Sequence, residues 1–154
     1  MRFCSIASGS SGNCIYVGSE NTHVLVDTGI SGKKMEAGLN SLDLTGRDLD
    51  GILITHEHSD HIKGLGVISR KYGIPIYTTG GTVDAMVRTN ALGKIPDGIF
   101  HEIKEDEPFE IGDLTVNPFS IPHDAAQPVG YRLECDGHSV GIATDLGKYN
   151  DYII

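Results

Sequence analysis

Four side chains that can bind a metal ion fall within six consecutive residues of the chain: His56, His58, Asp60 and His61. Imidazole nitrogens together with a carboxylate suit zinc, and also manganese or iron, better than calcium or magnesium. Because His56 and His58 are two residues apart, an extended turn would direct both side chains to the same side. The run therefore predicts a metal site. The alternative is a solvated polar turn in which the histidines occur by chance.

The segments around this cluster have the residue types needed to hold it. Residues 51–55 are apolar and predict a buried strand that ends where the cluster begins. Asp60 and His61 fall at the expected start of a helix over residues 61–72, which Gly73 and Pro75 terminate. The four side chains would thus lie in a strand–turn–helix unit, from which Asp60 and His61 can diverge toward a second ion.

The rest of the chain alternates between short strands and two further helices. We predict strands at residues 2–7, 13–17, 23–27, 74–78, 99–103, 108–111, 114–121, 129–135 and 139–144. Helices are predicted at residues 31–42, with Ser31 as N-cap, and at residues 82–91, with Thr82 as N-cap. The Asp136-Gly137 pair predicts a hairpin turn. The chain has no internal repeat and no linker, so residues 1–154 are expected to form a single domain.

The pattern His-x-His-x-Asp-His after an apolar strand resembles the signature of the metallo-β-lactamase superfamily, whose fold is an αββα sandwich of the α+β class. Three other segments resemble the same family in the same order. Residues 25–29 resemble its early strand that ends in a buried aspartate. Residues 120–124 resemble the segment with its third histidine, and residues 141–145 the strand with its bridging aspartate.

The resemblance implies a two-metal site, most readily for zinc, with manganese or iron as alternatives. It implies that His56, His58 and His123 bind the first metal, that Asp60 and His61 bind the second, and that Asp145 bridges both. Asp60 could also orient the nucleophilic water or take its proton. By the same resemblance Asp27 would hold a ligand histidine through its other ring nitrogen, although a turn aspartate at a strand end is the alternative. No substrate-binding residue can be assigned.

A bacterial branch of this superfamily, the YycJ/WalJ-like proteins, resembles the chain further in residues 7–13, 56–66 and 123–126. That branch is usually assigned nuclease or phosphodiesterase activity. Members of the family continue past the point where this chain stops and add a last histidine for the second metal. His138 lies in the expected hairpin and is not predicted to be that ligand. We therefore expect the N-terminal part of the sandwich, as a truncated product.

Three features next to the ligands have simpler interpretations. The loop at residues 8–13 could offer backbone N–H groups to a phosphate, or it could be a tight hairpin connection. Glu57 and Ser59 alternate with the ligands and are predicted to be solvated. Asp124 could support the neighbouring His123 or could belong to a plain turn.

The composition limits the cellular compartment and the binding partners that we expect for the chain. The formal net charge of −9 opposes tight, non-specific binding of nucleic acid, but a hydrolase that contacts few phosphates beside its metal ions stays possible. Cys4, Cys14 and Cys135 have no Cys-x-x-Cys spacing and are expected to be reduced in the cytoplasm. No segment has the length and apolarity of a membrane span or a secretion signal, so no membrane partner is expected.

Two classes of function stay open at this point. The first is a metal-dependent hydrolase in which a metal-bound hydroxide cleaves a phosphodiester of DNA or RNA or a small phosphodiester, with thioester or lactone hydrolysis as the nearest alternative. The second is a metal-binding but inactive fragment. The predicted ligand set is common to all of these, and the oligomeric state cannot be read from the residues.

Overall fold

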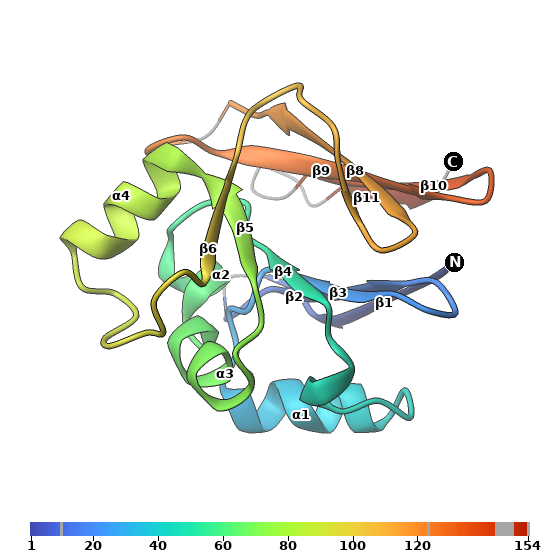
Figure 1. The fold of residues 1–154 in the computed structure, drawn as a ribbon, viewed down its shortest axis with the longest axis horizontal. Helices are drawn as coiled ribbons and strands as arrows, with labels where there is room; N and C mark the ends of the chain where they lie inside the picture. The colour runs from blue at the N-terminus through green and yellow to red at the C-terminus, as the bar shows by residue number, and fades with distance from the viewer. Residues whose placement is uncertain (10, 123, 144–149, 154) are drawn as a thin grey trace.

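The computed structural model describes residues 1–9, 11–122 and 124–143, and the backbone of residues 150–153. Two β-sheets lie face to face in it (Figure 1). The first sheet has the order β1-β2-β3-β4-β5-β6, antiparallel from β1 to β3 and parallel from β3 to β6. Its strands are β1 Arg2–Ala7, β2 Cys14–Gly18, β3 His23–Val26, β4 Gly51–Leu53, β5 Ile76–Thr79 and β6 Phe100–Ile103.

The second sheet is antiparallel throughout and has the order β11-β10-β9-β8-β7. Its strands are β7 Phe109–Ile111, β8 Leu114–Ser120, β9 Val129–Cys135, β10 His138–Ala143 and β11 Asn150–Ile153. The predicted turn at Asp136 and Gly137 is confirmed, with φ angles of 50° and 78° that match a tight hairpin between β9 and β10.

Helices cover the first sheet on the side away from the second (Figure 1). The helical segments are α1 Gly32–Asn40, the 3-10 turn η1 Gly46–Asp48, α2 Ser59–Ile62, α3 Leu65–Tyr72 and α4 Gly80–Arg88. Apolar side chains of α1 and α3, such as Met35 and Leu65, form one core with Tyr16, Leu25 and Ile52 of the sheet. Residues on the opposite face of the same strands therefore remain for a second core.

That second core lies between the two sheets. Along β2, Tyr16 belongs to the helix-side core, while its neighbours Ile15 and Val17 pack toward β9 residues such as Tyr131 and Leu133. This alternation is the period of two that a strand imposes on its side chains. Helix, sheet and sheet thus form three of the four layers of the predicted αββα sandwich, among the residues that the structure describes. Among the described residues no helix covers the outer face of the second sheet, and none is long and apolar enough to cross a membrane.

Two predicted helices differ from the observed ones, and tertiary contacts explain both differences. The helix predicted over residues 61–72 is two helices, because the Gly64 amide donates to the Thr28 carbonyl and a Cβ at Gly64 would lie 2.1 Å from the Ile30 carbonyl oxygen. The helix predicted from Thr82 begins at Gly80 with Thr79 as N-cap, where the Gly81 amide donates to the side chain of Gln127 at 2.8 Å. Ser31 is the N-cap of α1, as predicted. The short segments η1 and β11 were not predicted.

Removing the Tyr131 hydroxyl should weaken the contact between the sheets. This fully buried hydroxyl donates to the Ile54 carbonyl at 2.7 Å, and burial raises the pKa of Tyr131 well above its ordinary value, so the group stays a donor. We expect Tyr131→Phe to lower the free energy of unfolding by about 1 kcal/mol. Urea denaturation would measure the change.

Thr78 provides the matched comparison, because its hydroxyl donates to the same Ile54 oxygen at 3.0 Å. Thr78→Val should have a similar effect, and the double variant should lose more than either single one, since fewer donors then remain for a buried carbonyl. Unchanged stability in the double variant would contradict this account.

Candidate metal centre

The histidine motif lies where the chain leaves the first sheet. It follows β4, and its last two members fall in α2, for which His58 is the N-cap residue. His56 and His61 are fully buried and His58 is half-buried. The centre of the His56 ring lies 4.0 Å from that of His61 and 4.7 Å from that of His58. The fold therefore brings three imidazoles into one cluster.

Asp27 lies next to this cluster because β3 and β4 are parallel neighbours and their carboxyl ends meet at one edge of the sheet. Its side chain is 1% exposed, and its Oδ2 lies 2.6 Å from Nδ1 of His61. Both carboxylate oxygens also accept hydrogen bonds from Thr55, at 2.8 Å from the amide and 2.8 Å from the hydroxyl. With Nδ1–H donated to Asp27, His61 keeps Nε2 as the nitrogen for a metal.

Asp60 and Asn13 lie on the Nε2 side of His61. Asp60 Oδ2 is 3.5 Å from that nitrogen, and the carboxylate is partly open to solvent. The side-chain nitrogen Nδ2 of Asn13 is 3.3 Å from His61 Nε2 and 3.4 Å from Asp60 Oδ2, and Asn13 is only 3% exposed. The sequence placed Asn13 at the end of the loop at residues 8–13 and at the start of a predicted strand, with no role in the site. Nothing in the sequence singles it out, since Asp60 is 47 positions away.

Backbone contacts fix the same corner of the site. The Asn13 amide donates to the Asp60 carbonyl at 2.8 Å, and the Gly29 amide donates to the Asn13 carbonyl at 2.8 Å. A Cβ at Gly29 would lie 1.7 Å from the Asp60 carbonyl oxygen, so only glycine allows this approach. Within the loop, the Gly9 amide donates a hydrogen bond to the Asn13 side-chain oxygen, and the Gly12 amide donates one to the Gly9 carbonyl. These bonds favour the hairpin interpretation of residues 8–13 over a phosphate cradle.

Glu57 was predicted to be solvated, and that prediction is wrong. The residue is half-buried, and its Oε2 accepts a hydrogen bond from the Ala126 amide at 3.0 Å. Ser59 is exposed, as predicted. The alternation of side chains in the motif could not reveal that a loop 69 residues later lies beside Glu57.

Two of the six predicted ligands, His123 and Asp145, lie outside the described residues. Within the described part of the chain, no group of three or more His, Cys, Asp or Glu side chains has the arrangement needed to hold a metal ion. The donor set nevertheless suits zinc by its chemistry: imidazoles beside one carboxylate, with His61 oriented by a buried aspartate. The predicted ligands and the predicted role of Asp27 stay predictions.

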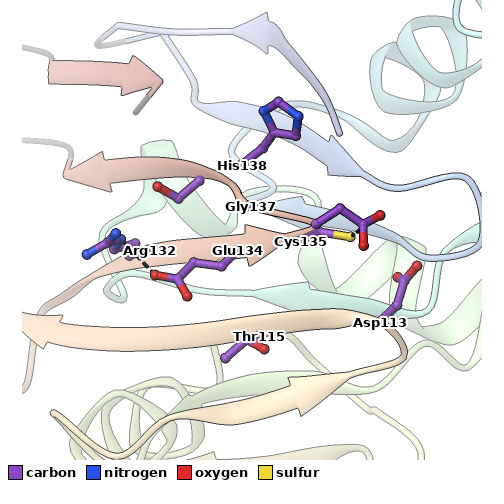
Figure 2. A pocket seen from close by; sticks show the side chains of 9 residues that line it. Asp113, Thr115, Arg132, Glu134, Cys135, Gly137 and His138 are labelled. Atoms are coloured by element: carbon purple, nitrogen blue, oxygen red, sulfur yellow. Dashed lines mark hydrogen bonds and ion pairs between the residues drawn. The ribbon is translucent and has the colours of Figure 1, made fainter.

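His138 lies elsewhere, as expected for a hairpin residue. It lines a pocket at the β9–β10 turn together with Arg132, Glu134 and Cys135 (Figure 2). Arg132 and Glu134 form an ion pair there at 3.1 Å, and the Cys135 thiol is 3.7 Å from a carboxylate oxygen of Asp136. None of the described predicted ligands lines this pocket.

The chain belongs to the β-lactamase superfamily, because the family model described as "Beta-lactamase superfamily domain" matches residues 22–154. It is 41% identical over 151 residues to exodeoxyribonuclease YycJ of Bacillus anthracis, an alignment that covers 98% of this chain and 56% of the relative. It is also 41% identical over 150 residues to exodeoxyribonuclease WalJ of Streptococcus pneumoniae, covering 97% of this chain and 56% of the relative. The chain therefore spans about half the length of these relatives, and the resemblance inferred from the sequence is confirmed.

Solved structures confirm the fold class. A variant of a metallo-β-lactamase from Cronobacter sakazakii superposes with a TM-score of 0.76 at 15% identity, over 90% of this chain and 58% of that one. The metallo-β-lactamase GOB-18 from Elizabethkingia meningoseptica gives a TM-score of 0.69 at 16% identity, over 85% and 54% of the two chains. The described sheets and helices are thus those of a metallo-β-lactamase sandwich.

Proposed function

We propose that this chain is the metal-binding part of a hydrolase that cleaves phosphodiester bonds in DNA or RNA. The observation that carries the proposal is the cluster of His56, His58 and His61 beside Asp60, with Asp27 holding His61. The names of the relatives, exodeoxyribonucleases at 41% identity, support a nucleic-acid substrate. The proposal treats residues 1–154 as one domain and includes His123 and Asp145 among the ligands.

Two divalent ions, most readily zinc, would supply Lewis acidity and lower the pKa of a bound water. The side chains of this chain have distinct tasks around them. Asp27 keeps the proton on Nδ1 of His61, and the Asn13 amide can hold the Asp60 carboxylate in place. Asp60, partly open to solvent, can accept a proton from a nucleophilic water.

The net charge of −9 sets a limit on how such an enzyme would hold nucleic acid. A surface of that charge repels phosphates except where metal ions create a local positive field. We therefore propose few phosphate contacts, concentrated at the metal site. Location in the cytoplasm is also part of the proposal. The thiols of Cys4, Cys14 and Cys135 are unpaired, as a reducing compartment requires, and burial raises the pKa of the Cys14 thiol, which keeps it inert.

Removing one imidazole of the cluster should lower the metal content. We expect His58→Ala to reduce the zinc, manganese or iron bound per chain, because a half-buried ligand beside His56 is lost. Elemental analysis after purification in metal-supplemented medium would measure the content. His101→Ala is the control, since His101 lies on the edge strand β6, packs on Tyr77 of β5 and has no predicted ligand role.

The function itself is tested by turnover on matched substrates. The protein at its full natural length should release nucleotides from DNA or RNA ends with added zinc or manganese, and a chelator should stop the reaction. A thioester, a lactone and a β-lactam serve as comparison substrates. Hydrolysis of one of these without phosphodiester cleavage would overturn the substrate class. Wild-type protein without any transition metal would overturn the metal-dependent mechanism.

A further inference from the structure

The loop between β8 and β9 contains His123, the predicted third ligand of the first metal. The loop lies at the protein surface, and Pro122, Asp124 and Ala126 are exposed. It comes from the second sheet, whereas the cluster of His56, His58 and His61 follows the first sheet. A ligand on such a loop contributes to metal affinity only as far as other contacts hold the loop in position.

The first contact that holds it comes from within the histidine motif. Glu57 stands between His56 and His58 in the sequence, and its Oε2 accepts the Ala126 amide hydrogen at 3.0 Å. The second oxygen, Oε1, is buried and has no hydrogen-bond partner among the described residues. One oxygen of the Glu57 carboxylate is therefore shielded from water, which is unfavourable for a charged group. The hydrogen bond that the other oxygen accepts comes from the loop.

The second contact is made by Gln127, the residue after Ala126. The Gln127 side-chain oxygen accepts the Gly81 amide hydrogen of α4 at 2.8 Å, and the Gln127 carbonyl accepts the Thr79 hydroxyl at 2.8 Å. The Gln127 amide group also donates to Glu105 at 3.3 Å. A Cβ at Gly81 would lie 2.7 Å from Cβ of Gln127, so glycine makes this close approach possible.

Both ends of the loop are closed as well. The Ile121 amide donates to the Pro128 carbonyl at 3.4 Å, and the Val129 amide donates to the Thr55 carbonyl at 3.0 Å. Thr55 is the residue directly before His56 and also binds Asp27. The loop is therefore attached to the histidine motif at its base through Thr55 and near its middle through Glu57.

We propose that Glu57 is a positioning residue for the first metal. Its acceptor oxygen, together with the contacts of Gln127, fixes the β8–β9 loop, which contains the predicted ligand His123, relative to His56 and His58. This inference rests on the proposed function. Groups that orient metal ligands typically change metal affinity by about 10- to 100-fold when removed.

Two substitutions at Glu57 separate its acceptor from its charge. Glu57→Ala removes the acceptor, so zinc affinity should fall by about 10-fold or more, and the Ala126 amide should exchange its hydrogen faster. Glu57→Gln keeps an oxygen acceptor and should stay close to wild type in both measurements. Competition with a chromophoric chelator reads the zinc affinity, and NMR-detected hydrogen exchange reads the amide. Ser59→Ala, an exposed neighbour in the same motif, is the matched control.

The outcomes distinguish this inference from the proposed function. If wild-type protein binds zinc and Glu57→Ala binds it equally well, the inference fails and the metal site stands. If Glu57→Gln is as weak as Glu57→Ala, charge and not the bond to Ala126 matters, which also overturns the inference. If wild-type protein binds no zinc, both fail. Should Glu57→Ala unfold, Gln127→Ala removes the other anchor and must lower zinc affinity in the same direction.

Discussion

Asp27→Asn is expected to lower zinc affinity by about 10- to 100-fold, the range found when a partner of a metal-binding histidine is lost. Asp27 accepts the Nδ1 hydrogen of His61 at 2.6 Å and two hydrogen bonds from Thr55. An asparagine offers an N–H where the carboxylate offers an oxygen. His61 would then turn Nδ1 into an acceptor and place its hydrogen on Nε2, the nitrogen that a metal needs.

The backbone makes this substitution a clean one. Asp27 has φ 64°, a left-handed conformation that asparagine tolerates at least as well as aspartate. Isothermal titration with zinc would measure the affinity, and thermal unfolding without metal would measure the fold. Asp43→Asn is the matched control, because Asp43 is an exposed aspartate with φ 61°. Equal zinc affinity in Asp27→Asn and wild type would refute the role proposed for Asp27.

Asp60→Asn is expected to remove most turnover while leaving the fold intact. The substitution removes a ligand charge and a proton acceptor beside His61 Nε2, and general acid–base groups typically contribute about 10²- to 10⁴-fold to rate. The fold should persist because the contacts of Asp60 with Asn13 and Gly29 include its backbone carbonyl, which the substitution keeps.

The measurement is the rate of nucleotide release at saturating metal, with circular dichroism as the check on folding. Asp84→Asn, an exposed position on α4, is the control for a simple change of net charge. Turnover in Asp60→Asn at the wild-type rate would show that neither its charge nor its proton acceptor is used in the reaction.

Much of the fold could be predicted because its signals are local. Strands β1, β3, β4, β8 and β9 coincide with apolar or alternating runs, to within two residues at each end. The break between α2 and α3 could not be predicted, because it depends on Gly64 packing against the Thr28–Ile30 backbone. Likewise the start of α4 depends on Gln127, which lies 46 residues from Gly81 in the chain.

The site residues, too, could be predicted from the sequence only where the signal is local. The cluster at residues 56–61 could be predicted because its members are contiguous in sequence, and Asp27 came from a family resemblance and not from spacing. Asn13 and Glu57 could not be assigned, since their partners Asp60 and Ala126 are 47 and 69 residues away. The ligand roles of His123 and Asp145 remain predictions, because neither residue belongs to the described part of the chain.

The attachment of the β8–β9 loop to Thr55 and Glu57 has a consequence for the order of folding. The histidine motif is held by β3, β4 and the helices beside them. These elements are near one another in the sequence, so we expect their contacts to form early in folding. The loop needs the second sheet, and its bonds to the motif span more than seventy residues at Thr55, so its closure costs more chain entropy and comes later. A chain that is still folding would bring His56, His58 and His61 together before the β8–β9 loop is attached to them. Tight zinc uptake would then mark the moment at which the sandwich closes.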